Sequence, residues 1–197
     1  MSAREKLAET LNQVAELAES IASPLGLCVV DARFGQTGKR RTLEVTIHRK
    51  NGSVSLDDCE SVSRGLEKVL DEQAASDKPL VEGSYMLEVQ SPGLERQLKT
   101  DREFGAFIGH EVLVQTKVKL PELGTRFTGT LSGIESDDIV LTKAKANPAK
   151  ATAKFVEKVA VSKSQLVNAK LYVDFEKAAS KGRSPDLTIE NKIENNN

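Results

Sequence analysis

Residues 83–98 read GSYMLEVQSPGLERQL, and the predicted architecture is built around this stretch. Apolar Tyr85, Leu87 and Val89 alternate with more polar neighbours, which is the period-two pattern of a strand with one face on a core. Ser91-Pro92-Gly93 then predicts a type II turn, because proline pre-sets φ at the first central position and glycine accepts a positive φ at the next. We therefore expect the last strand of one unit here, joined by an interdomain turn to a second unit.

The chain before this stretch predicts an α-β-β-α-β unit, residues 1–98. A helix is indicated by apolar residues at helical spacing, namely Leu7, Leu11, Val14, Ala18 and Ile21. Residues 28–34 and 43–47 alternate as two strands of a hairpin, and Ser55 is placed to cap a second helix that runs to about Asp71. Both helices should cover one face of the three-stranded sheet. The other face, expected to be open to solvent, would carry Val29, Asp31, Arg33, Thr42, Glu44, Thr46, His48, Met86, Glu88 and Gln90.

Residues 99–177 predict a small five-stranded β-barrel of the SH3-like or Sm-like kind, so the fold class is α+β. A short helical segment near residues 102–110 should precede strands around residues 112–117, 127–134, 139–142, 156–161 and 170–175. Gly129 and Gly133 fall where a strand must bend strongly to curl into a barrel. Residues 178–197 are polar and are expected to be disordered.

Composition limits the function classes. The chain carries 28 basic and 29 acidic side chains, so nucleic-acid contact must be local and not a property of the whole surface. Without a long apolar run or a targeting segment, the simplest expectation is a soluble cytoplasmic monomer with no membrane association. The two cysteines, Cys28 and Cys59, are far apart at apolar positions and are expected to be buried free thiols.

Three stretches resemble the bacterial ribosome maturation factor RimP family. The consensus Tyr-x-Leu-Glu-Val-Ser-Ser-Pro-Gly-Leu-Asp-Arg-Pro-Leu matches the frame of residues 85–98, apart from Gln90, Glu95 and Gln97. Further likeness lies in LDDCESVSRGLEKVLD, residues 56–71, and more weakly in LVNAKLYVDF, residues 166–175. The resemblance implies an SH3-like second unit and a role in small (30S) ribosomal subunit assembly, through rRNA binding and through ribosomal protein number twelve.

Basic residues supply the candidate RNA- or ribosome-binding positions. From Lys143 to Lys163 there are six lysines and one acid, which suits phosphate contact but equally suits a solvated loop. Three more cations follow the predicted hairpin turn, where they could contact phosphate. Arg96 matches the family's arginine at this position. It could contact RNA, or it could pair with an acid between the units, which is the role that we prefer. The candidates are Lys39, Arg40, Arg41, Arg96, Lys143, Lys145, Lys150 and Lys154, with Ser91, Pro92 and Gly93 as the interdomain turn.

Catalysis, cofactors and metals find little support in the sequence. His48 and His110 are the only histidines, and His48 stands where the family has an aspartate. No nucleophile motif accompanies them, and Asp57-Asp58 is explained by helix capping. We therefore expect a non-enzymatic assembly factor that binds no cofactor. The alternatives are an Sm-like RNA-binding regulator of non-ribosomal RNA and, from another class, a metal-dependent hydrolase.

Overall fold

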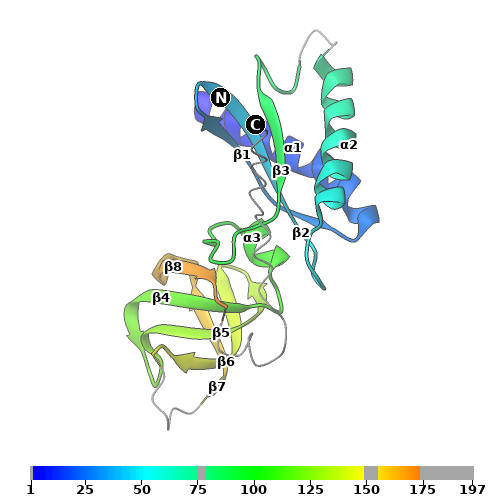
Figure 1. The fold of residues 1–197 in the computed structure, drawn as a ribbon. Helices are drawn as coiled ribbons and strands as arrows, with labels where there is room; N and C mark the ends of the chain where they lie inside the picture. Colours follow the sequence, from blue (N-terminus) through cyan, green and yellow to red (C-terminus); the bar gives the residue numbers. More distant parts are fainter. Residues whose placement is uncertain (1, 75–78, 149–154, 174–197) are drawn as a thin grey trace, which may run out of the picture.

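The computed structural model describes residues 2–74, 79–148 and 155–173. The first unit has the predicted order of elements (Figure 1): α1 (Ala3–Ala22), the 3-10 turn η1 (Ser23–Leu25), β1 (Cys28–Thr37), β2 (Arg40–His48), α2 (Leu56–Ala74) and β3 (Met86–Gln90). β1 and β2 form an antiparallel hairpin, which confirms that prediction, and β3 pairs with β2 in parallel. A parallel pair needs a crossover connection, and α2 supplies it.

Both long helices begin at serine caps. Ser2 caps α1, and at α2 the Ser55 hydroxyl accepts the Asp58 N–H at 3.1 Å while the Asp58 carboxylate accepts the Ser55 N–H at 3.0 Å. These bonds satisfy backbone groups that have no partner within the helix. The backbone bond from Ser55, followed by the side-chain bond from Arg49, lowers the pKa of Asp58. The predicted capping role of Ser55 is therefore confirmed.

The two helices pack on the same face of the first sheet, as predicted (Figure 1). Val14 and Ala18 of α1 and Leu66 of α2 are fully buried against Leu43 and Ile47 of β2. Tyr85, Leu87 and Val89 are partly buried against the same core. The alternation in residues 83–98 therefore predicts correctly which face of β3 lies on the core.

Close approach of α1 and α2 depends on Gly65. A Cβ added there would lie 2.8 Å from Ile21 Cγ2, whereas a Cβ at Gly105 would meet no atom within 4 Å. We expect Gly65→Ala to lower the free energy of unfolding by about 1 kcal/mol through overpacking. Gly105→Ala should raise it by about 0.5 kcal/mol, since glycine costs helix stability. Urea unfolding of both variants checks this pair, and shifts of the same sign would contradict the packing argument.

A β-bulge in β1 changes which residues face the helices. The predicted set placed Cys28 and Val30 with Ala32 and Phe34, but the register with β2 shifts between Val29 and Asp31. Val29 therefore joins the helix-side core, and Val30 packs into the core of the second unit. A bulge inserts one residue and reverses the alternation before it, so a strict period-two reading is wrong over Cys28–Val30.

The second unit is a five-stranded antiparallel sheet preceded by a short helix. Its elements are α3 (Asp101–Ala106), β4 (Glu111–Leu120), β5 (Gly124–Glu135), β6 (Asp138–Ala146), β7 (Val156–Ser162), the 3-10 turn η2 (Lys163–Gln165) and β8 (Leu166–Leu171). Register shifts at Thr128/Thr130 and Leu131/Gly133 place irregularities beside the predicted bend glycines. The order is β7-β6-β5-β4-β8, so β7 and β8 are the terminal strands and do not pair with each other in the described residues. The α+β class is confirmed, but the sheet is not closed into a barrel.

Two details of this unit differ from the prediction. The last strand is Leu166–Leu171 and not residues 170–175, because Ala169, which is 2% exposed, is a core position of β8 opposite Val114. The turn after β3 is also displaced. Gly93 does not have a positive φ, and the hydrogen-bonded turn runs from Gly93 to Arg96, where the Arg96 N–H donates to the Gly93 carbonyl at 3.1 Å. Pro92 has no N–H for a strand ladder, so it ends β3 without forming the tight turn itself.

The connector continues directly onto the second unit. The Leu98 N–H donates to the Ala169 carbonyl at 2.8 Å, and the Leu171 N–H donates to the Arg96 carbonyl at 2.9 Å. Leu98 is buried in the core of the second unit. The division of the chain at Leu98 stays a prediction, and the tail at 178–197 lies outside the described residues.

The sheet face opposite the helices is not open along its whole length. Thr46 is 2% exposed and His48 is 8% exposed, because α3 packs on β1 and Phe107 lies against the His48 ring. At the other end of the same face Arg33 is exposed, as is Met86. The prediction of a solvent-facing surface is therefore wrong near His48, where the second unit docks. It is also wrong for Thr42, which is fully buried, and for Val29, which belongs to the helix-side core.

Candidate nucleic-acid interface

Three predicted site residues gather at the tip of the β1–β2 hairpin. Gly38 has a φ of 63° in the turn, a conformation that favours glycine, and this turn presents Lys39, Arg40 and Arg41 in sequence. All three are exposed. The Arg41 guanidinium lies 3.7 Å from the Phe34 ring centroid and donates to the Glu82 carbonyl at 2.7 Å. Arg41 is therefore held in place, whereas Lys39 and Arg40 make no ion pair with any described residue.

A hollow of about 720 Å³ adjoins this tip. It is lined by the three cations, by Glu67 of α2, and by Tyr85 and Met86 where the chain enters β3. Burial, and then the charges of Asp71 and Glu67, raise the pKa of the Tyr85 hydroxyl, so this group remains a neutral donor. Cations beside an aromatic and a thioether surface can contact a phosphate and an adjoining base or ribose together.

The lysine-rich segment is mostly strand where it is described. Lys143 and Lys145 lie on β6, and Lys145 Nζ is 6.0 Å from the centroid of Phe155, whose side chain is 58% exposed. Lys158 pairs with Glu135 at 3.1 Å, and Lys163 pairs with Asp101 at 2.7 Å. These two pairs neutralise part of the local excess of positive charge. Lys150 and Lys154 lie outside the described residues.

Arg96 lies apart from both basic clusters, in a polar cluster where the two units meet. Its side chain is 13% exposed, and its Nη2 is 2.8 Å from both Asp31 Oδ2 and Glu103 Oε1. Its Nη1 donates to Thr46 Oγ1 at 3.2 Å. This is the interdomain ion pairing that we preferred for Arg96. We therefore leave Arg96 out of the candidate RNA surface.

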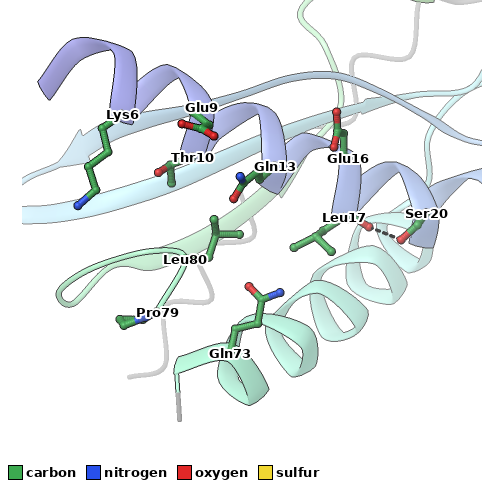
Figure 2. A pocket seen from close by; sticks show the side chains of 10 residues that line it. All are labelled: Lys6, Glu9, Thr10, Gln13, Glu16, Leu17, Ser20, Gln73, Pro79 and Leu80. Carbon is green, nitrogen blue, oxygen red and sulfur yellow. Dashed lines mark hydrogen bonds between the residues drawn. The ribbon is translucent and has the colours of Figure 1, made fainter. Parts of the chain in front are cut away.

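A groove of about 690 Å³ on the helical layer has the opposite character (Figure 2). Glu9 and Glu16 project from α1 beside Leu17, with Leu80 on the facing segment. Lys6, the one cation among the described residues of its lining, is paired with Glu82 at 2.9 Å. Carboxylates repel phosphate, so this side of the molecule is unsuited to RNA.

The described residues show neither a metal cluster nor a membrane span. Within residues 2–74, 79–148 and 155–173, no group of three or more His, Cys, Asp or Glu side chains could hold a metal ion. No helix in those ranges is long and apolar enough to cross a membrane. Cys28 and Cys59 are free, as predicted, but they are half-buried and not fully buried.

Comparison with known proteins identifies the family. The chain is an α+β protein with two sheets, and its residues 17–95 match the model described as the RimP N-terminal domain. A ribosome maturation factor RimP from Rippkaea orientalis is 50% identical over 54% of this chain and 66% of its own length. Another, from Microcystis aeruginosa, is 42% identical over 64% of this chain and 78% of its own length. The chain belongs to the ribosome maturation factor RimP family.

Solved structures resemble one part of the chain more distantly. An Sm-like archaeal protein from Pyrobaculum aerophilum matches with a TM-score of 0.30 and 18% identity, over 42% of this chain and 61% of that one. A Pyrococcus abyssii Sm protein, solved in complex with a uridine heptamer, matches with a TM-score of 0.28 and 18% identity, over 35% of this chain and 92% of that one. We draw no conclusion about ligands from similarity at this level.

Sequence reasoning missed the acidic partners of Arg96. Asp31 is 65 residues away along the chain, and no local pattern connects the two. Glu103 carried a usable signal, because Thr100 and Glu103 form a capping box at the start of α3 and so place Glu103 close to the connector. The burial of His48 was also missed, since it results from docking of the second unit.

Proposed function

We propose that this chain is a non-enzymatic assembly factor for the small (30S) ribosomal subunit, acting as a cytoplasmic monomer on the immature particle. It would contact subunit RNA and ribosomal protein number twelve. The observation that carries the proposal is membership of the RimP family, with curated ribosome maturation factors at 50% and 42% identity. The unpaired cations of the hairpin tip support the RNA contact.

Two separate basic surfaces would engage the particle. One is the tip with Lys39 and Arg40, and the other is the β6 surface with Lys143 and Lys145. β2 runs from Arg40 at the tip to His48 at the junction, a span of roughly 30 Å for an extended strand. Two contacts of moderate affinity at a fixed separation reinforce each other, because once one has formed the other is at a high effective concentration. The protein can still dissociate when one of the two contacts is lost. An assembly factor has to leave, and this arrangement allows it.

The direct test is sedimentation of the tagged full chain through a gradient of native lysate at low salt. Migration with free small subunits, lost at raised salt, is the expected result. Migration with RNA outside the ribosomal fractions would instead favour an Sm-like regulator. A position at the top of the gradient at all salt concentrations would contradict the proposal.

Removing the tip charges should weaken this association in a salt-dependent way. For Lys39→Ala with Arg40→Ala we expect the slope of log K against log salt to become shallower by about 1–2, since up to two phosphate contacts are lost. The matched control is Lys6→Ala with Arg64→Ala, which removes the same charge from cations already paired with Glu82 and Glu60. Equal slopes for the two double variants would show that net charge, and not the tip, governs binding.

A further inference from the structure

A pocket of about 300 Å³ lies where the two units meet, and both units contribute to its wall. His48 and the loop at residues 52–54 line it from the first unit, and the connector at residues 91–94 closes one side. His110, Glu111 and Tyr172 line it from the second unit. A group bound here would therefore contact both units and the connector together.

His48 presents an unsatisfied polar atom at this pocket. Its ring centroid is 4.6 Å from that of Phe107 and 5.0 Å from that of His110, and the residue is 8% exposed. Its Nε2 is buried and has no hydrogen-bond partner among the described residues. Native proteins pair nearly all of their buried polar atoms, so an orphan at the wall of a pocket points to a missing partner.

The Nδ1 of His110 is likewise buried without a hydrogen-bond partner among the described residues, and Glu111 adds a further unpaired group. It lines the same pocket and is half-buried, yet no described residue forms an ion pair or a side-chain hydrogen bond with its carboxylate. Its carbonyl accepts the Tyr172 N–H at 2.9 Å, which places Tyr172 beside it. Among the residues that the structure describes, no lysine or arginine lines the pocket. The lining therefore favours a cation over an anion such as phosphate.

We propose that this pocket binds the guanidinium group of an arginine side chain from a basic protein partner. Guanidinium is planar, bonds a carboxylate through two parallel N–H groups and stacks on aromatic rings, which matches Glu111 beside Tyr172 and the imidazoles. The inference rests on the proposed function in one respect, because it names the chemistry by which a ribosomal protein would be held.

The test uses the full chain and follows its imidazole signals by NMR. With only two histidines in the sequence, His48 and His110 supply the whole set of imidazole signals. N-acetyl-arginine amide should shift both with a dissociation constant on the order of 1 mM, as expected for so small a fragment. The neutral isostere N-acetyl-citrulline amide should shift neither. Guanosine monophosphate tests the rival occupant, a flipped-out RNA base.

Variants locate the contact. Glu111→Gln, nearly isosteric, should weaken arginine amide binding by about fivefold or more, while Glu157→Gln, an exposed carboxylate on β7, should leave it unchanged. Equal unfolding midpoints for both variants would show that the fold is intact. Absence of histidine shifts with the arginine probe, equal response to citrulline, or preference for the nucleotide would each overturn the inference.

Failure of this inference can be told apart from failure of the proposed function. If the chain sediments with small subunits but the arginine probe gives no shift, the pocket assignment falls and the function stands. If the probe binds in a Glu111-dependent way but the chain does not sediment with small subunits, the proposed function falls. The pocket would then bind an arginine of another basic partner.

Discussion

Replacing Arg96 with methionine should lower the free energy of unfolding by about 3 kcal/mol, because it leaves two carboxylates uncompensated at the junction of the units. Its guanidinium bonds Asp31 and Glu103, and the Glu103 side chain is only 8% exposed. Burial raises the pKa of Glu103, but bonds from the Lys99 N–H, Arg96 and the Thr100 N–H outweigh it and lower the pKa overall. Loss of Arg96 removes one of these bonds and leaves Asp31 facing Glu103.

Urea unfolding measured by far-UV circular dichroism checks this expectation. The matched control is Arg64→Met, which breaks the Arg64–Glu60 pair on α2, where the two side chains are 77% and 57% exposed. An exposed pair of this kind contributes little, so the control should change stability by no more than about 0.5 kcal/mol. Similar losses in the two variants would mean that Arg96 is as well hydrated in solution as Arg64.

The cluster also bears on how the two basic surfaces work together. Asp31 belongs to β1 and Glu103 to α3, so Arg96 ties the first sheet to the second unit beside the connector. A connector alone would leave the units free to reorient. Bonds at 2.8 Å from one guanidinium to both sides join the two units beside the connector, which would limit the movement of the proposed basic surfaces relative to each other.

Local patterns predict the elements of this chain well. The order of helices and strands, the serine cap of α2, the hairpin and the inward face of β3 all follow from alternation, helical spacing and capping chemistry, which act over a few residues. The hairpin-tip cations were found for the same reason, since a turn with Gly38 presents whatever follows it. Most predictions that depend on neighbours in sequence therefore hold, although the type II turn at Ser91-Pro92-Gly93 does not.

Features set by contacts between distant residues could not be predicted in this way. The bulge that moves Val30 to the second core, the burial of His48, and the pairing of Arg96 with Asp31 all depend on how the units dock. Whether the second sheet closes depends on the strands at its two edges, which a count of strands does not fix. Alternation also overlooked Ala169, because a small side chain gives little apolar signal.

Lowering the pH from 6.5 to 4 should reduce the free energy of unfolding by up to about 3 kcal/mol, because His48 is buried and resists protonation in the folded chain. Burial first, and then the charge of His110, lower the pKa of His48 from 6.5 to about 4. As pH falls, the unfolded chain takes up this proton before the folded chain does, so stability is complete above pH 6.5 and is lost toward pH 4.

His48→Phe should remove that part of the pH dependence. Phenylalanine keeps a ring against Phe107 and cannot be protonated. The free energy of unfolding of the variant should therefore change less than that of the wild type between neutral pH and about pH 4.5. Groups such as Asp58 and Glu103, whose pKa values are lowered, titrate in both chains, and their contribution cancels in the comparison. Urea unfolding at the two pH values measures the difference. Identical pH dependence in the two chains would show that the His48 ring is hydrated, and hence that the two units separate in solution.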